Sequence, residues 1–362
     1  MKIFRLFYIA TIFTLLVACG AGGRGDDRPT RKPTAEGPTA APTAAPTPAP
    51  NEYRAPNIYP IKVFDNYTVT DPKRNNRKFP ILIRYPANAP GPLPLVVWSH
   101  GGDANSNGHH LNERWGITLA SAGYVVIHIA HVDDKFDTHC APLKIPASEC
   151  EPADFRGEVS KGGTLSGLFY NRPRDSIAVL DDLDNIERAA NLKFDRARIG
   201  AGGHSAGTNG VLSLAGAVLD VSPSVHNLTS ADPRFKVFLV NSPQGVGYLG
   251  MTQNSWDKIT APVMVATGAG DTTPGEQAKD RLDPYKYMPA GDKYLLYIDS
   301  TNASHGTFAL GDDGDASLKP YIASSGAAFF DAYLRGLPEA KAWINSDKVS
   351  LWSKGVAKIT AK

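Results

Sequence analysis

Short, uninterrupted apolar runs recur along the chain, and they restrict its fold more than any other feature. Two examples are LVVW at residues 95–98 and VMVA at residues 263–266. Such runs are typical of strands buried on both faces of a largely parallel sheet. We predict eight strands of this sheet, at residues 62–69, 79–85, 93–99, 124–130, 197–202, 235–241, 262–267 and 293–299.

Helical patterns fall between these runs. Pro173 suits the first turn of a helix, and the apolar residues after it, Ile177, Leu180, Leu183 and Ile186, recur at three-residue spacing. A second helix is expected at about residues 318–334. Strands that alternate with helices predict an α/β domain, with helices on both faces of a mostly parallel eight-stranded sheet. We expect this single domain to cover residues 53–362 of the 362-residue chain.

The N-terminus has the features of an export signal. A basic start with Lys2 and Arg5 precedes an apolar run that ends at Ala18. The sequence LVAC at residues 16–19 resembles the lipobox of bacterial lipoproteins, in which the cysteine carries the lipid. We therefore expect residues 1–18 to be removed and Cys19 to anchor the protein to a membrane of the cell envelope. The alternative is a plain secretory signal with Cys19 discarded.

Residues 19–52 are rich in proline, threonine, alanine and glycine and contain almost no large apolar side chains. A segment of this composition does not form a core, so we interpret it as a disordered linker between the anchor and the domain. Removal of Lys2 and Arg5 with the signal lowers the formal charge from +2 to zero. A neutral mature chain without basic clusters argues against nucleic acid as a partner.

The segment at residues 133–171 interrupts the alternation of strands and helices. It has no clear periodicity, and long irregular segments of this kind are often lids or binding loops. Cys140 and Cys150 lie in it, and an even number of cysteines in an exported domain favours a disulfide; two free thiols are the alternative. We expect this lid-like insertion to cover the active site and to offer Phe169 and Tyr170 to a substrate.

The pentapeptide GHSAG at residues 203–207 follows a predicted strand and precedes a small, apolar, helix-like segment. Strand, sharp turn and helix are the context of a nucleophile elbow, in which Ser205 is the nucleophile. Glycine two residues before and two residues after the serine avoids a steric clash at the turn. The alternative is a glycine-rich turn with an incidental serine.

A serine nucleophile needs a histidine base that is oriented by a carboxylate. In this context the partners follow the serine in the order acid, then histidine. Asp271 comes after the strand at residues 262–267, and His305 comes after the strand at residues 293–299. We therefore predict Asp271 as the acid and His305 as the base. The competitors are Asp299 for the acid and His204 and His226 for the base.

An ester hydrolase of this kind also needs two backbone amides that bind the oxyanion. The amide of Ala206, directly after the nucleophile, is one candidate. The other is the amide of Gly102, because the strand at residues 93–99 runs directly into His-Gly-Gly. Gly101 and Asp103 are the alternatives to Gly102, and a glycine turn without a ligand role is the alternative for the whole loop.

Together these segments resemble a branch of the α/β-hydrolase superfamily, namely proteins similar to platelet-activating-factor acetylhydrolase, to chlorophyllase and to predicted dienelactone hydrolases. The matching segments are IRYP at residues 83–86, SHGG at 99–102, LASAGYVV at 119–126, RPRD at 172–175 and GHSAG at 203–207. The resemblance implies a serine hydrolase that acts on carboxylic esters without metal or cofactor. True dienelactone hydrolases have cysteine where this chain has Ser205. Polyester hydrolases are more distantly similar. Trp115, after the predicted oxyanion loop, resembles a residue of their binding surface.

Other histidines and acids in the sequence have no convincing metal-ligand spacing. These groups are His109 with His110, His128 and His131 with Asp133, and DDGD at residues 312–315. The prediction is therefore an exported, lipid-anchored serine esterase. The alternatives are a polyester or lipid hydrolase and, from another class, a non-catalytic envelope protein.

Overall fold

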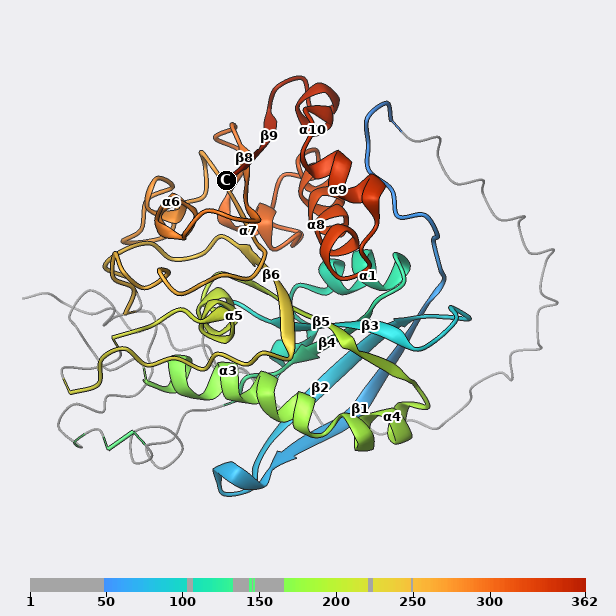
Figure 1. Cartoon of the computed structure of the whole chain (residues 1–362), viewed down its shortest axis with the longest axis vertical. Helices are drawn as coiled ribbons and strands as arrows, with labels where there is room; N and C mark the ends of the chain where they lie inside the picture. The colour runs from blue at the N-terminus through green and yellow to red at the C-terminus, as the bar shows by residue number, and fades with distance from the viewer. Residues whose placement is uncertain are drawn as a thin grey trace, which may run out of the picture. The chain divides into compact units, whose positions relative to one another are not determined.

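A mostly parallel sheet runs through the part of the chain that the structure describes (Figure 1). In the computed structural model, the described residues are 49–102, 107–132, 143–144, 146, 166–220, 224–248 and 250–362. Residues 48–362 form one compact unit. Its nine strands follow the order β1-β2-β4-β3-β5-β6-β7-β8-β9.

All eight predicted strands occur in the sheet. The strands are β1 (Ile61–Asp71), β2 (Arg77–Pro86), β3 (Leu93–Ser99), β4 (Val125–Ile129), β5 (Phe194–His204), β6 (Phe235–Asn241), β7 (Val263–Gly268), β8 (Lys293–Ile298) and β9 (Ala357–Ala361). The six strands from β4 to β8 in the sheet order pair in parallel. The remaining pairs are antiparallel: β1 with β2 and β2 with β4 at one side of the sheet, and β9 with β8 at the other.

The predicted count of eight strands is wrong, because β9 adds a ninth at the edge beside β8. Only Ala357 of its five residues is buried, and the others are partly or fully exposed. An edge strand of this kind carries no continuous apolar run, so the pattern that predicts the inner strands misses it.

Helices cover both faces of the sheet (Figure 1). On one face lie α3 (Ser166–Asp181), α4 (Leu183–Ala190) and α5 (Gly207–Ala215). On the other face lie α1 (Glu113–Ser121), α8 (Lys319–Tyr333) and α9 (Pro338–Ile344), and α8 confirms the helix predicted near residues 318–334. Shorter helices are α6 (Asp283–Tyr287), α7 (His305–Phe308), α10 (Lys348–Trp352) and the 3₁₀-helices η1 (Pro72–Arg74), η2 (Gly108–His110) and η4 (Asp280–Leu282).

Helix α3 differs from the prediction at its start. It begins at Ser166 instead of at Pro173, which lies inside the helix. Proline has no N–H to donate to the carbonyl of Phe169, four residues earlier, so the helix interior loses one bond there. Tertiary packing offsets this loss, because the Phe169 side chain is fully buried in the core. The prediction of Phe169 as a substrate contact is therefore wrong.

Several predicted features lie outside the described residues. They are the signal at residues 1–18, Cys19, most of the linker, Asp103, Cys140 and Cys150, and most of the insertion at 133–171. In the part of the chain that the structure describes, no helix is both long and apolar enough to cross a membrane.

Candidate active site

Ser205 occupies the sharp turn between β5 and α5, at the carboxyl edge of the sheet. Its φ is +52°, a left-handed conformation that is unfavourable for serine. Two close backbone approaches explain the glycines around it. A Cβ on Gly203 would lie 3.1 Å from the backbone of Gly207, and a Cβ on Gly207 would lie 2.3 Å from the carbonyl oxygen of Ser99. The turn therefore has the strained geometry of a nucleophile elbow.

Asp271 and His305 meet at the same edge. Asp271 follows β7 and is completely buried, and His305 begins α7 after β8. The Nδ1 atom of His305 lies 2.9 Å from Oδ1 of Asp271, and the hydroxyl of Thr267 donates a 2.8 Å hydrogen bond to Oδ2. The side chain of His305 is 22% exposed, so solvent and small molecules reach its ring.

His204 links Ser205 to this pair. The ring of His204 packs on that of His305 at 4.6 Å between centroids, and its Nε2 hydrogen-bonds the carbonyl oxygen of His305 at 3.0 Å. Burial and the nearby His305 lower the pKa of His204 to about 3, so its imidazole is neutral at neutral pH. His204 therefore supports His305. Within the described residues, no hydrogen bond joins the Ser205 hydroxyl to His305, and hydrogen bonds between a nucleophile and its base often tighten only in the complex with substrate.

The other competitors lie apart from this arrangement. Asp299 is exposed, and its amide donates to the carbonyl of Val356. His226 is half-exposed and lies 3.4 Å from Asp220. Neither residue is paired with the groups around Ser205.

Arg281 is a further partner of Asp271, and the sequence did not predict it. It is fully buried, and its Nε lies 2.8 Å from the carbonyl oxygen and 3.0 Å from Oδ1 of Asp271. Burial by itself raises the pKa of Asp271, but the hydrogen bond from His305 and the charge of Arg281 outweigh it and leave the pKa below its usual range. Asp271 is therefore ionised at neutral pH, as the orienting acid of a triad must be.

Arg281 also reaches Glu276, which lies 3.1 Å from its Nη2. Burial raises the pKa of Glu276 to about 7 in spite of this arginine. Glu276 lies in the segment after Asp271 and Arg281 lies in η4; neither carries a motif, so the sequence offered no signal for either.

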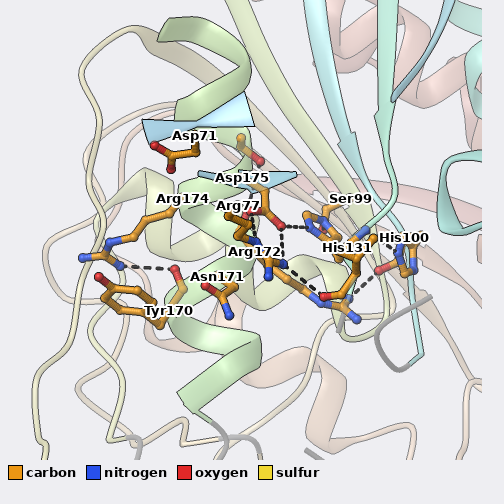
Figure 2. A network of polar contacts seen from close by, with 12 residues as sticks. Asp71, Arg77, Ser99, His100, His131, Tyr170, Asn171, Arg172, Arg174 and Asp175 are labelled. Atoms are coloured by element: carbon orange, nitrogen blue, oxygen red, sulfur yellow. Dashed lines mark hydrogen bonds and ion pairs between the residues drawn. The ribbon is translucent and has the colours of Figure 1, made fainter. Parts of the chain in front are cut away.

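A second Ser-His-Asp set lies beneath the loop that follows β3 (Figure 2). The hydroxyl of Ser99 lies 2.8 Å from Nε2 of His131, and Nδ1 of His131 lies 3.0 Å from Oδ2 of Asp175. Each of these three residues is at most 2% exposed, so a substrate does not reach this set. Arg77 binds Asp175 at 2.9 Å, and burial lowers the pKa of His131 to about 4. These groups form a closed structural network.

Arg172, beside this network, binds the predicted oxyanion loop (Figure 2). Its guanidinium donates a 2.7 Å hydrogen bond to the carbonyl oxygen of His100 and a 2.5 Å bond to that of Gly102. Gly102 has a φ of +73°, and a Cβ there would meet no atom within 4 Å. Ala206, the other predicted donor, is the N-cap residue of α5 and is fully buried. Sequence reasoning identified the loop but not the arginine that holds it.

Trp115 and Tyr170, two of the predicted substrate contacts, pack against other side chains. Trp115 is completely buried: its ring stacks on Trp98 at 5.1 Å, and its Nε1 donates a 3.0 Å hydrogen bond to the carbonyl of Phe308, the last residue of α7. It therefore supports the helix that begins with His305, and its prediction as a substrate contact is wrong. The ring of Tyr170 lies beneath the guanidinium of Arg174, 3.9 Å from the ring centroid.

A surface hollow lies at the opposite end of β5 from Ser205. Tyr85, Leu93, Glu187 and Asn191 are among its lining residues. Its lining residues include no serine, histidine or cysteine, so Ser205 and its neighbours remain the candidate site. No family model matches the chain, and no curated protein matches it.

Proposed function

We propose that this protein is a serine hydrolase of carboxylic esters, with an α/β-hydrolase fold and the triad Ser205, His305 and Asp271. One observation carries the proposal: a buried, ionised Asp271 orients a partly exposed His305 at the sheet edge where Ser205 occupies a strained turn. This combination is the geometry of a nucleophile, a base and the group that orients the base.

In the proposed reaction, the Ser205 hydroxyl attacks the ester carbonyl carbon while Nε2 of His305 accepts its proton. Asp271 accepts a hydrogen bond from Nδ1–H of His305 and stabilises the imidazolium that forms. The amides of Ala206 and Gly102 bind the oxyanion. His305 then gives its proton to the leaving alcohol. Water, deprotonated by His305, hydrolyses the acyl-enzyme and restores Ser205.

Exposure to solvent is our reason for proposing the Ser205 set, and not the Ser99 set, as the catalytic one. The Ser99 set is enclosed, and the charge of its aspartate is matched by Arg74 and Arg77, at 2.7 and 2.9 Å. In the proposed mechanism its role is structural: the backbone amide of His131 donates a 3.2 Å hydrogen bond to Nε2 of His100, and Arg172 separately binds the carbonyl of His100. An oxyanion hole is effective because its hydrogen-bond donors are held in a fixed orientation before the reaction begins.

The cellular setting is part of the proposal. The basic and apolar start of the chain and the LVAC sequence at residues 16–19 favour export and a lipid anchor at Cys19. In that compartment a disulfide between Cys140 and Cys150 is expected. Metabolic labelling with a fatty acid, compared between the wild type and Cys19→Ala, tests the anchor.

The central experiment compares Ser205→Ala with Ser99→Ala, which removes the hydroxyl of the competing set. We expect a fluorophosphonate probe to label the wild type and Ser99→Ala but not Ser205→Ala. Nitrophenyl esters of increasing acyl length and a short polyester then define the substrate class. Labelling that persists in Ser205→Ala, or that disappears only in Ser99→Ala, would overturn the assignment of Ser205.

A further inference from the structure

Asp65, His109 and His110 converge at a point outside the proposed catalytic site. Asp65 lies on the edge strand β1, and the two histidines end the 3₁₀-helix η2. One ligand atom from each side chain lies within 4.8 Å of the others. We propose that these three residues bind a divalent transition metal ion, with Zn²⁺ as the representative ion.

The distances fit ligands of one ion better than they fit hydrogen bonds. Nε2 of His109 lies 3.5 Å from Oδ1 of Asp65, and Nε2 of His110 lies 3.6 Å from Oδ2. Good hydrogen bonds between these atom types are about 2.7–3.2 Å long. Metal–nitrogen bonds of about 2.0–2.1 Å place two tetrahedral ligands about 3.3–3.4 Å apart. Small side-chain movements therefore complete the coordination.

The backbone of β1 aims Asp65 at the histidines. The pairing of β1 with β2 shifts register between Phe64 and Tyr67, so Asp65 lies in an irregular part of the ladder. Bulges of this kind redirect a side chain and recur beside functional sites. This irregularity is independent of the three side chains themselves.

Burial also fits a metal site. His109 is only 6% exposed, and its Nδ1 is buried without a hydrogen-bond partner among the described residues. Its Nε2 faces Asp65, and with Nε2 bound to an ion the Nδ1 atom carries the proton of the neutral imidazole. The side chains of His110 and Asp65 are 50% and 40% exposed, which leaves an entry path and room for water as a fourth ligand. Two imidazoles and one carboxylate favour Zn²⁺, Co²⁺, Ni²⁺ or Cu²⁺ over Mg²⁺.

An ion at this position ties the edge strand to the segment behind the oxyanion loop. Gly108, the first residue of η2, packs so closely on the ring of His100 that a Cβ there would lie 2.0 Å from its Nε2. The role we infer is structural. It requires no step at Ser205, so the proposal stands or falls separately from the proposed hydrolase.

The test measures Zn²⁺ binding to the full chain by titration calorimetry and by metal analysis after dialysis. We expect one bound Zn²⁺ per chain, a melting temperature that rises with Zn²⁺, and no binding of Mg²⁺ in the same range. Asp65→Asn and His110→Gln change partly exposed side chains and should fold, which circular dichroism checks. We expect both variants to bind Zn²⁺ at least about tenfold more weakly.

His226→Gln is the matched control, because it removes a half-exposed histidine that lies beside a carboxylate, 3.4 Å from Asp220, outside the proposed metal site. It should bind Zn²⁺ like the wild type. The three cysteines of the chain are the same in all variants, so zinc held by thiols would not respond to these substitutions. Absence of Zn²⁺ binding, equal binding of Mg²⁺, or unchanged affinity in Asp65→Asn and His110→Gln would overturn the proposal.

Discussion

The guanidinium of Arg172 donates a 2.7 Å hydrogen bond to the carbonyl oxygen of His100. It donates a second hydrogen bond to the carbonyl oxygen of Gly102. One side chain of α3 thus fixes the two peptide groups on either side of the Gly102 amide. Because a peptide group is planar, fixing a carbonyl also fixes the N–H of the next residue, and the Gly102 amide lies between the two fixed peptide groups. Arg172 thereby sets the orientation of the loop in which we place an oxyanion donor.

Arg172→Lys should therefore lower kcat by about 10- to 100-fold with little change in KM, because lysine cannot bind both carbonyls and a small displacement of the donor weakens only the transition state. Steady-state kinetics on a short nitrophenyl ester measure both constants. Arg174→Lys, two residues later on the same helix, is the control, since Arg174 bonds Ser230 and the carbonyl of Tyr170. An equal loss in both variants, or a change in KM alone, would contradict the role of Arg172.

The sequence predicted the sheet and the candidate triad because both follow local rules. Apolar runs mark the inner strands, and Ser205, Asp271 and His305 each follow a strand end that parallel pairing brings to one edge. Arg172 and Arg281 were not predicted, because both bind backbone carbonyls that are distant in the sequence. Arg172 binds those of His100 and Gly102, and Arg281 binds those of Ser242 and Pro243. Every residue has a backbone carbonyl, so such partners cannot be recognised from residue types.

Trp115 was misplaced for a related reason. It follows the predicted oxyanion loop in the chain, but only the packing of α1 on the sheet determines which way its side chain points. The ninth strand was missed because its side chains are mostly exposed.

Trp115→Phe tests whether this buried indole supports the helix of His305. Phenylalanine keeps an aromatic ring beside Trp98 but leaves the carbonyl of Phe308 without its donor, which should lower the free energy of unfolding by about 1–3 kcal/mol. Displacement of α7 should also lower kcat about tenfold. Kinetics and urea unfolding measure the two effects.

Trp256→Phe is the matched control, because Trp256 is equally buried but its Nε1 has no hydrogen-bond partner among the described residues. It should leave kcat unchanged. If both variants lose activity equally, loss of packing and not the bond to Phe308 is the cause.

Buried neutral histidines make the folded state sensitive to acid. Burial and the nearby Arg84 lower the pKa of His128 to about 3. Between that value and about pH 6.5, where histidine titrates in an unfolded chain, the unfolded state binds a proton that folded His128 does not. The free energy of unfolding therefore falls as the pH falls through this window, by about 2 kcal/mol from this residue between about pH 7.5 and about pH 5.

His128→Gln should make that decline smaller by about 2 kcal/mol. Urea unfolding at the two pH values measures it. An identical decline in the wild type and His128→Gln would show that His128 is not the source.

Gly207→Ala tests why the elbow requires glycine after Ser205. The added Cβ would lie 2.3 Å from the carbonyl oxygen of Ser99 and 2.6 Å from that of His100, and both atoms belong to the backbone of the oxyanion loop. A side-chain rotation cannot relieve such contacts, so α5 and the loop must separate. We expect a loss of about 1–3 kcal/mol in the free energy of unfolding and a fall in kcat of about 100-fold.

Gly336→Ala is the control, because Gly336 has a φ of +68° but its Cβ would meet no atom within 4 Å. It should lose about 1–2 kcal/mol through backbone strain and keep the wild-type kcat. If Gly207→Ala also kept that kcat, close contact between the elbow and the oxyanion loop would not be needed for catalysis.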